Sequence, residues 1–306
     1  RGQSHLGSSD QRGRLQGRCQ GMAETGLRER GHAAADGEQC EAQSALSVIV
    51  PTYNETENIR PLCERLFKTI EGTSLKIELI IVDDESKGSE ETEKIAKQLA
   101  SEGYSVRIHC RKRSEGRGLS SAVLLGFKLA AHRIVLCMDA DLQHEPESVP
   151  DVARPVLEGK AEFSVGSRHV TGGGVGFEWS MLRQIVSRGA TMLAWPVAAS
   201  SDPMSGFFCV SKEVLQRGEG RLNLIGFKIG LEIMVRCRCS PIQDVAITFQ
   251  ERAAGESKLS AKQYLLYVEQ LASLYWDKFG MLLVALLIVL AMALLYLLFL
   301  LVKLVQ

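Results

Sequence analysis

Residues 134–143 read Ile-Val-Leu-Cys-Met-Asp-Ala-Asp-Leu-Gln, and this stretch decides the fold that the chain can adopt. Its first five residues are apolar, which is typical of a strand buried on both faces of a sheet. Two carboxylates, Asp139 and Asp141, follow with one residue between them. Side chains two apart on an extended backbone point to the same face, about 6–7 Å apart. That spacing lets two acids share one hard divalent cation, although a lone Asp-x-Asp also fits a solvated strand end.

Apolar strands alternate with amphipathic helices on both sides of this stretch. Strands are predicted at residues 46–50, 77–82, 106–110, 134–138, 163–166 and 242–249, and helices at 59–70, 89–101, 119–131 and 147–157. The alternation predicts an α/β fold, a mostly parallel sheet with right-handed crossovers and helices on both faces. Ligands bind such sheets at the carboxyl ends of the strands.

Polar residues follow three of the predicted strands. Pro51-Thr52-Tyr53-Asn54-Glu55 follows the first, Asp83-Asp84 the second and Asp139-Ala140-Asp141 the fourth. We therefore expect one acidic edge, which favours a cation site over solvated strand ends. The chain has neither Gly-x-Gly-x-x-Gly after the first strand nor Gly-Lys-Ser/Thr, which disfavours dinucleotide-dependent dehydrogenases and P-loop enzymes. Phosphate must then be held by a metal and by basic side chains. His144, beside the acid pair, is interpreted as a surface residue or as a support for the acids.

Composition limits the class of protein. Lysine plus arginine equals aspartate plus glutamate, 36 each among 306 residues, so nucleic acid is not an expected partner. The eight cysteines form no Cys-x-x-Cys pair and several lie in apolar segments. This favours reduced thiols and a catalytic domain that faces the cytosol. Residues 1–45 contain eight glycines but no Phe, Tyr, Trp, Val or Ile, so we expect them to be disordered.

The C-terminal part of the chain predicts membrane attachment. Residues 281–302 are polar only at the Tyr296 hydroxyl. As a helix they span about 33 Å, enough to cross a hydrocarbon layer of about 30 Å, so we predict a transmembrane helix at 280–303. The segment before it, 261–279, carries apolar and aromatic residues at helical spacing. Because Tyr and Trp favour the headgroup region, it is predicted to lie on the membrane surface; a helix packed into the core is the alternative.

The motifs together resemble a known family. The three strand-end motifs resemble those of inverting GT-A glycosyltransferases of family 2. Four later motifs resemble those of the dolichyl-phosphate mannose synthases: Gly166-Ser167-Arg168, Ser201-Asp202-Pro203-Met204-Ser205-Gly206-Phe207-Phe208, Gly226-Phe227-Lys228 and Gly255-Glu256-Ser257-Lys258-Leu259-Ser260. The resemblance covers residues 46–279 and implies a GT-A domain at 46–260. The C-terminal anchor resembles the single-chain form found in yeast, which implies that accessory subunits are not required.

Two motifs of related enzymes differ or are missing. The family usually has Asp-Asp-x-Ser-x-Asp-Gly after the second strand, whereas residues 83–88 read Asp-Asp-Glu-Ser-Lys-Gly, without the third aspartate and one residue shorter. This leaves the geometry of the loop open. The chain also lacks Gln-x-x-Arg-Trp, the acceptor-site signature of processive synthases such as those of cellulose and chitin.

The resemblance implies a reaction and a set of site residues. Mannose would pass from GDP-mannose to dolichyl phosphate with inversion, at the endoplasmic reticulum membrane, for N-glycan, GPI-anchor and O-mannose assembly. Mg²⁺ or Mn²⁺ would be held by Asp139, Asp141 and Gln143, and the catalytic residues would be Asp141, Arg252 and Lys258. The implied nucleotide-sugar contacts are Pro51, Tyr53, Glu55, Val82, Asp84, Asp139, Ala140, Asp141, Arg168, Arg252 and Lys258.

Two alternative functions remain open at this point. The sibling enzyme that makes dolichyl-phosphate glucose from UDP-glucose shares the sheet and the acids, but it typically carries its membrane span at the amino end. A non-catalytic, membrane-anchored protein that binds sugar nucleotides is the other alternative. The intact set of Asp139, Asp141, Arg252 and Lys258 argues against it, because binding alone does not need the full set of metal and phosphate ligands.

Overall fold

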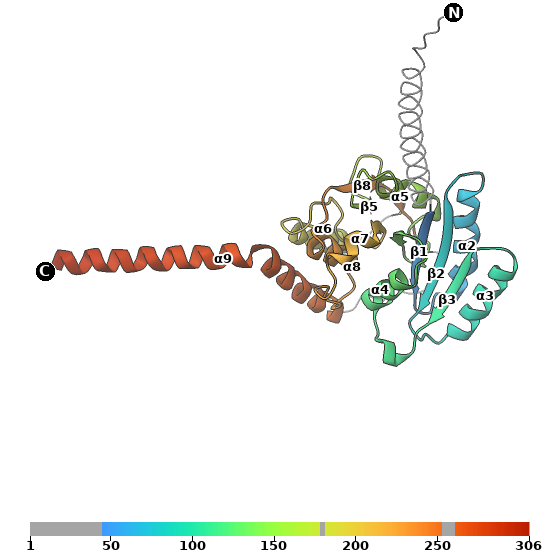
Figure 1. The fold of residues 1–306 in the computed structure, drawn as a ribbon, viewed down its shortest axis with the longest axis horizontal. Helices are drawn as coiled ribbons and strands as arrows, with labels where there is room; N and C mark the ends of the chain where they lie inside the picture. Colours follow the sequence, from blue (N-terminus) through green and yellow to red (C-terminus); the bar gives the residue numbers. More distant parts are fainter. Residues whose placement is uncertain (1–44, 178–180, 253–260, 306) are drawn as a thin grey trace, which may run out of the picture. The chain divides into compact units, whose positions relative to one another are not determined.

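The computed structural model describes residues 45–177, 181–252 and 261–305. Its main sheet has the strand order β3-β2-β1-β4-β7-β5-β8 (Figure 1). The strands are β1 (Ala45–Thr52), β2 (Lys76–Asp83), β3 (Val106–Cys110), β4 (Ile134–Cys137), β5 (Phe163–Ser167), β7 (Phe208–Ser211) and β8 (Ile242–Ala246). Neighbouring strands are parallel except β7, which is antiparallel to both β4 and β5. The predicted α/β fold with a mostly parallel sheet is confirmed.

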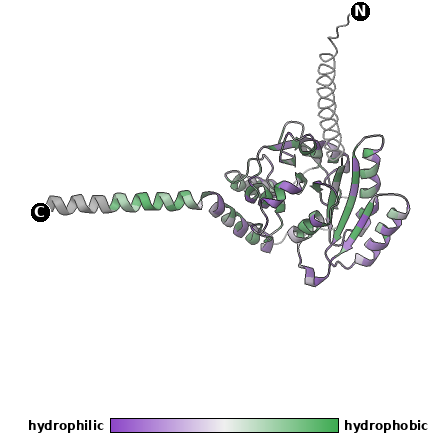
Figure 2. Ribbon diagram, viewed as in Figure 1, coloured by the Kyte–Doolittle hydropathy of each residue, from purple (hydrophilic) through white to green (hydrophobic). Residues whose placement is uncertain are grey.

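Helices cover both faces of this sheet. They are α2 (Thr56–Ile70), α3 (Ser89–Ser101), α4 (Leu119–Leu129), α5 (Val149–Leu157), α6 (Met181–Ala194), α7 (Lys212–Gln216), α8 (Ile229–Arg236) and α9 (Ala261–Val305), with 3-10 turns η1 (Arg113–Glu115) and η2 (Pro146–Ser148). Strand β1 explains the two layers, because its successive side chains point to opposite faces. Leu46, Val48 and Val50 pack with α2, α3 and α5, whereas Ile49 packs with α4 and α8. Figure 2 shows hydrophobic residues along these central strands.

The C-terminal strand and one helix end differ from the prediction. Residues 242–249 form two strands, β8 and β9 (Thr248–Phe249), and β9 pairs in a second small sheet with β6 (Gly174–Val175). The break falls at Ile247, which is buried and whose N–H donates to the Ser167 carbonyl at 3.1 Å. Beyond Ile247 the chain leaves the main sheet and runs toward the carboxyl ends of its strands. Helix α4 ends at Leu129, two residues earlier than predicted, because the next residue has an extended backbone.

Helix α9 joins the predicted surface helix and the predicted span without a break, as one helix of 45 residues. Within the described part of the chain, it is the helix long and apolar enough to cross a membrane, over Lys262–Leu294, where an 18-residue window has a mean hydropathy of 2.2. Figure 2 shows this apolar stretch. All described side chains of residues 281–294 are exposed, as expected of a segment that faces lipid.

The first third of α9 packs against the domain on one side and is exposed on the other, so core packing is observed and the placement on a membrane surface stays a prediction. Leu271 and Leu274 are buried in the same hydrophobic cluster as the buried residues of α8. The Tyr267 hydroxyl donates to the Ala190 carbonyl of α6 at 2.7 Å. Leu265 and Trp276 point outward and are 72% and 64% exposed. The helix therefore carries a second apolar side that the described residues do not cover.

Gly126 of α4 lies directly against β1. A Cβ atom at this position would come within 2.2 Å of Ile49 Cγ2 and 3.2 Å of Val82 Cγ2. We expect Gly126→Ala to lower the free energy of unfolding by about 1–3 kcal/mol, the usual cost of overpacking a core. The measurement is the thermal unfolding midpoint in detergent.

The matched control is Gly189→Ala on α6, where a Cβ atom meets nothing within 4 Å. It should keep or slightly raise the midpoint, because alanine is the better helix former. Equal midpoints for Gly126→Ala and the unchanged protein would contradict the close packing of α4 on β1.

Candidate active site

The carboxyl ends of β1, β2, β4, β5 and β8 lie at one edge of the sheet, because these strands run in the same direction. Strand β7 runs the other way, so its amino end reaches this edge and brings Ser205 and Gly206 there. Gly206 lies directly beside Asp139, the first of the two acids that follow β4. A Cβ atom on Gly206 would be 3.2 Å from Asp139 Oδ2, so the glycine leaves room for that carboxylate.

The turn after β4 arranges the acid pair predicted from the sequence. Leu142 has a positive φ of 61°, which closes the turn and lets the backbone N–H of Gln143 donate to Asp141 Oδ1 at 3.1 Å. The Gln143 side chain donates to the Gln250 carbonyl at 3.1 Å. The side chains of Asp141 and Gln143 are therefore held on the same side of the turn by two separate contacts.

Burial raises the pKa of both Asp139 and Asp141. For Asp139 the main opposing effect comes from Lys228, followed by Arg252, while the Asp139 charge raises the pKa of Asp141 further. Two neighbouring carboxylates that both resist ionisation are stabilised as anions by a cation between them. Within the described residues no group of three or more His, Cys, Asp or Glu side chains could hold a metal ion. Two carboxylates and the Gln143 amide fit Mg²⁺ or Mn²⁺ when other oxygens complete the shell.

Arg252 crosses from the segment after β9 to this acid pair. Its Nη2 lies 2.9 Å from Asp141 Oδ2 and 3.5 Å from Gln143 Oε1. Its Nη1 lies 4.0 Å from Glu55 Oε1. Three predicted site residues that follow β1 or β4, Glu55, Asp141 and Gln143, thus lie around one guanidinium from the C-terminal part of the domain. Lys258, predicted to act with Arg252, lies outside the described residues.

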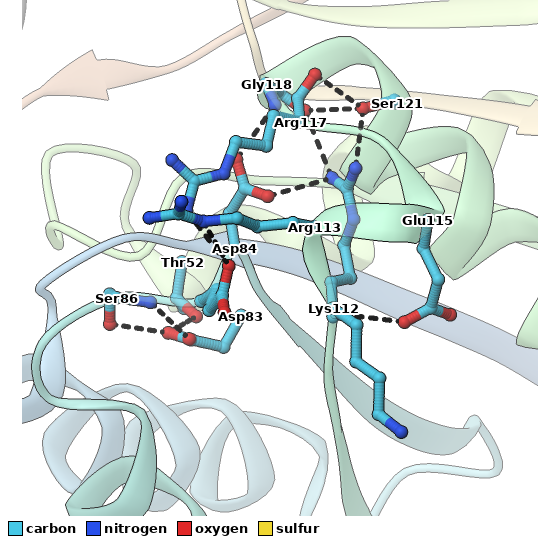
Figure 3. Close-up of polar contacts among 12 residues, drawn as sticks. Thr52, Asp83, Asp84, Ser86, Lys112, Arg113, Glu115, Arg117, Gly118 and Ser121 are labelled. Atoms are coloured by element: carbon cyan, nitrogen blue, oxygen red, sulfur yellow. Dashed lines mark hydrogen bonds and ion pairs between the residues drawn. The ribbon is translucent and has the colours of Figure 1, made fainter.

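The two aspartates at the end of β2 have different environments. Asp83 is fully buried and accepts from Thr52 Oγ1 at 3.1 Å, from Ser86 N at 3.1 Å and from Ser86 Oγ at 3.0 Å (Figure 3). It also accepts from the hydroxyl of Ser89. Asp83 thereby closes the short loop at 83–88, whose geometry the sequence left open.

Asp84 points instead toward the loop that follows β3. Its Oδ2 accepts from the backbone N–H of Gly118 at 2.8 Å (Figure 3). Its Oδ1 is buried and has no hydrogen-bond partner among the described residues, although Arg111 Nη1 lies 3.4 Å away. A buried acceptor without a hydrogen bond is costly, and the charge of Arg111, whose side chain is 1% exposed, offsets this cost.

The remaining predicted contacts differ in how far their side chains are exposed. Val82 and Ala140 are buried in the core, so only their backbone atoms can face a ligand. Tyr53 is exposed beside the edge, Pro51 is buried, and Glu55 accepts from Asn58 Nδ2 at 2.9 Å.

Arg168 is oriented by a buried carboxylate. Its Nε and Nη2 donate to the two carboxylate oxygens of Asp202, at 2.7 and 2.8 Å. Its guanidinium carbon also lies 5.1 Å from the centre of the Phe249 ring. Arg168 is therefore held at the edge by two contacts.

Three further residues lie near the edge: His144 was interpreted as a surface residue or as a support for the acids, and Lys228 and Arg111 were given no site role. His144 is buried against Phe207 and Phe249, and its Nδ1 accepts from the Asp139 backbone N–H at 3.2 Å, so it supports the acid turn and is not a surface residue. Burial lowers the pKa of His144 to about 4, which keeps it neutral. Lys228 lines the same small pocket as Asp139, and burial lowers its pKa to about 8. The third residue is Arg111, beside Asp84.

An apolar surface formed by α6 lies next to the start of α9. Its exposed residues include Met181, Ile185, Met192 and Leu193, and Trp195 directly follows the helix. The hydroxyl of Tyr275 on α9 donates to the Leu193 carbonyl at 2.9 Å. The sequence signal for this helix was weak, because its apolar residues are interrupted by Arg183, Gln184 and Arg188.

Comparisons with curated proteins identify relatives over most of the chain. The dolichol-phosphate mannosyltransferase of Saccharomyces cerevisiae is 44% identical over 241 residues, which cover 76% of this chain and 88% of that protein. The protein of the same name from Mycosarcoma maydis is 43% identical, with 76% and 80% covered. That of Pyrococcus furiosus is 41% identical, with 76% and 64% covered.

Solved structures agree with the fold. Mannosyl-3-phosphoglycerate synthase from Rubrobacter xylanophilus superposes with a TM-score of 0.55 at 20% identity, covering 76% of this chain and 75% of that one. Glucosyl-3-phosphoglycerate synthase from Mycobacterium tuberculosis, in complex with Mn²⁺, UDP and phosphoglyceric acid, gives 0.54 at 20% identity, covering 79% and 81%. The profile of glycosyl transferase family 2 matches residues 47–217. The chain therefore belongs to glycosyl transferase family 2 and, within it, to the family of the dolichol-phosphate mannosyltransferases.

Proposed function

We propose that this protein transfers mannose from GDP-mannose to dolichyl phosphate and gives dolichyl β-D-mannosyl phosphate. The observation that carries the proposal is the strand-end edge, where Asp139, Asp141 and Gln143 lie beside Arg252 in a chain 44% identical to a dolichol-phosphate mannosyltransferase. Because the edge gathers both carboxylates and cationic side chains, it suits a donor whose diphosphate needs cations on more than one side.

Asp139, Asp141 and Gln143 are the residues that would hold a divalent cation, Mg²⁺ or Mn²⁺. Bound there, the cation would neutralise charge on the departing nucleoside diphosphate. Arg252 and Lys258 are assigned to the phosphates, since a guanidinium can contact two phosphate oxygens at once. Arg168 is held by Asp202 at the same edge and is assigned to the phosphates as well.

The loops around Asp84 are assigned to the base and ribose, with Pro51, Tyr53, Glu55 and the backbone of Val82 and Ala140 nearby. The Asp84 carboxylate is a hydrogen-bond acceptor that is partly exposed at this edge, and guanine carries two adjacent N–H donors on one edge. Uracil carries one N–H between two carbonyl oxygens, so it offers this carboxylate fewer donors. This difference favours GDP over UDP as the leaving group.

The acceptor phosphate is an anion near neutral pH, so it can attack the sugar carbon without a strong general base. His144, the histidine at the edge, is kept neutral by burial and accepts from the Asp139 backbone N–H. It orients the acid turn and takes no proton from the acceptor. In-line displacement would invert the sugar centre and give the β-linked product.

The lipid acceptor explains the apolar surfaces around α6 and α9. The exposed side chains of α6 and of the first third of α9 suit the headgroup region of a bilayer, and the apolar part of α9 suits its interior. We infer a C-terminal anchor in the endoplasmic reticulum membrane, with the catalytic domain in the cytosol and no requirement for accessory subunits. The described cysteines are all free thiols, which agrees with a reducing compartment.

The test offers radiolabelled GDP-mannose or UDP-glucose to membranes that contain the chain, with dolichyl phosphate added. We expect mannose transfer from GDP-mannose and little transfer from UDP-glucose. Transfer of glucose would support the sibling activity, and binding without transfer would support a non-catalytic protein.

The variant Asp141→Asn should lower mannose transfer by about 10²-fold or more, because it removes a charge from the cation site while keeping the side-chain size. The matched control is Asp151→Asn on α5, whose exposed carboxylate pairs only with nearby Arg154 in the described contacts. It should keep normal activity. Near-normal transfer by Asp141→Asn at saturating Mg²⁺ or Mn²⁺ would refute the cation assignment.

Cutting the chain after Gly280 should keep the packed third of α9 but remove the apolar part. We expect the shortened protein to leave carbonate-washed membranes and still to bind GDP. Its use of long-chain dolichyl phosphate should fall by about 10²-fold, because enzyme and lipid no longer share one thin layer. Use of a short-chain, water-soluble prenyl phosphate should fall much less. Firm retention on washed membranes would contradict the assignment of the span.

A further inference from the structure

The guanidinium of Arg252 occupies the open side of the acid turn. Asp141 Oδ1 is already engaged by the Gln143 backbone N–H, at 3.1 Å. The other oxygen, Oδ2, is in contact with Arg252 Nη2 at 2.9 Å. The same nitrogen is 3.5 Å from Gln143 Oε1. Two of the three groups assigned to the divalent cation therefore face one arginine.

A divalent cation and this guanidinium compete for Asp141 Oδ2, because both are positively charged and both approach this one oxygen closely. A Mg²⁺–oxygen contact is about 2.0–2.1 Å long, and the guanidinium nitrogen lies at hydrogen-bond distance from the same atom. The Asp141 side chain is only 9% exposed, and that of Arg252 only 24%, so solvent screens the repulsion between the two cations poorly. Binding of one must then displace the other from this oxygen.

The backbone around Arg252 limits how far the arginine must move. Gln250 N donates to the Gln143 carbonyl at 2.9 Å, and Gln250 Nε2 donates to Glu145 Oε1 at 2.7 Å. The segment is thus fixed to the acid turn two residues before Arg252. A rotation of the Arg252 side chain alone can take the guanidinium away from Asp141. The guanidinium then still lies at the edge formed by the strand ends.

We propose that Arg252 and the divalent cation are alternative occupants of the Asp141 carboxylate, and that a nucleoside diphosphate removes the competition. Without nucleotide, Arg252 opposes the cation. When a diphosphate binds, its oxygens give Arg252 a new partner, so the cation takes Asp141 and the arginine takes a phosphate. The cation and the nucleoside diphosphate then bind together, and either one alone binds weakly. This inference rests on the proposed function for the assignment of Asp141 and Gln143 to the cation.

The exchange gives Arg252 a role that differs from that of a simple phosphate ligand. A simple phosphate ligand would affect nucleotide affinity and leave the affinity for the cation alone unchanged. A competing side chain instead weakens cation binding in the absence of nucleotide and strengthens the coupling between the two ligands. Because coupling is reciprocal, the same factor appears in the affinity for GDP measured with and without the cation.

The experiment measures Mn²⁺ binding to the full-length protein in detergent, from the electron paramagnetic resonance signal of free Mn²⁺, with and without GDP. A GDP blank accounts for Mn²⁺ held by GDP alone. We expect Arg252→Gln to tighten Mn²⁺ binding without GDP by about 5- to 10-fold and to reduce the GDP-dependent gain by a similar factor. Arg252→Lys should lie between Arg252→Gln and the unchanged protein, since it keeps the charge but loses the fork.

Two controls separate competition from a general charge effect. Arg238→Gln removes an exposed arginine just before β8, at the opposite edge of the sheet, and should leave Mn²⁺ binding unchanged. Asp141→Asn should lower Mn²⁺ affinity in the presence of Arg252 and also in its absence. Thermal midpoints of all variants check that the fold is kept.

Unchanged Mn²⁺ affinity in Arg252→Gln without GDP overturns the proposal. So does an Arg252→Lys variant that matches the unchanged protein, because charge alone would then account for the effect. An Asp141→Asn variant with full Mn²⁺ affinity overturns it too, since the cation would bind elsewhere. None of these measurements uses a sugar donor or a lipid acceptor. If the variants bind Mn²⁺ as expected but the protein transfers no mannose, the proposed function alone is refuted. If the protein transfers mannose but the variants do not bind Mn²⁺ as expected, the exchange between Arg252 and the cation alone is refuted.

Discussion

Two carboxylates at the end of a buried strand require positive charge, and much of the edge is arranged to supply it. Strand β4 delivers Asp139 and Asp141 to a site where burial raises their pKa, so their ionised forms depend on neighbouring cations. Arg252 contacts the second acid, while Lys228 is the strongest of the cations that act on the first. The fold can collect these groups because all but one of the strands in the main sheet run in the same direction.

A second set of buried charges joins the edge to the helix that carries the span. Glu232 of α8 is fully buried and accepts from Arg236 Nε at 3.1 Å, while Arg236 also pairs with Asp277 of α9 at 2.9 Å. Gln270 of α9 donates to Glu232 and to the carbonyl of Lys228, both at 3.2 Å. Removing one member would leave a buried charge or amide without its partner, which is costly. The start of α9 is therefore packed into the same unit as the strand-end edge and leads directly into the candidate membrane span.

The sequence carries enough information for the α/β fold and for the convergence of the strand ends. Apolar runs and helical periodicity report burial directly, so β1, β2, β4 and α3 lie where they were expected. Strand β7 was not predicted. It lies between β4 and β5 in the sheet, and its four residues do not indicate this position. The separation of β9 from β8 depends on how Ile247 packs, which periodicity does not report.

The side-chain partners at the site were harder to predict than the strand ends. The family resemblance implied that Asp141, Gln143 and Arg252 act at one site, but not that they contact one another. The burial of His144 depends on Phe207 and Phe249, which are 63 and 105 positions away in the sequence. Such long-range contacts are set by tertiary packing, so a single sequence gives no local signal for them.

The difference between Asp83 and Asp84 bears on how sequence variants of this protein are interpreted. The two residues are adjacent in one motif, yet Asp83 is fully buried and holds Thr52, Ser86 and Ser89 together, while Asp84 keeps an oxygen without a hydrogen-bond partner among the described residues. Loss of the Asp83 carboxylate leaves several buried donors unpaired, a defect of folding that reduces the amount of protein in a cell. Loss of the Asp84 carboxylate removes fewer contacts, those with the Gly118 N–H and with Arg111, from a loop that Asp83 still closes, and under the proposed function it also removes a ligand contact. Protein abundance, measured beside activity, therefore separates two neighbouring substitutions that motif matching would treat as equivalent.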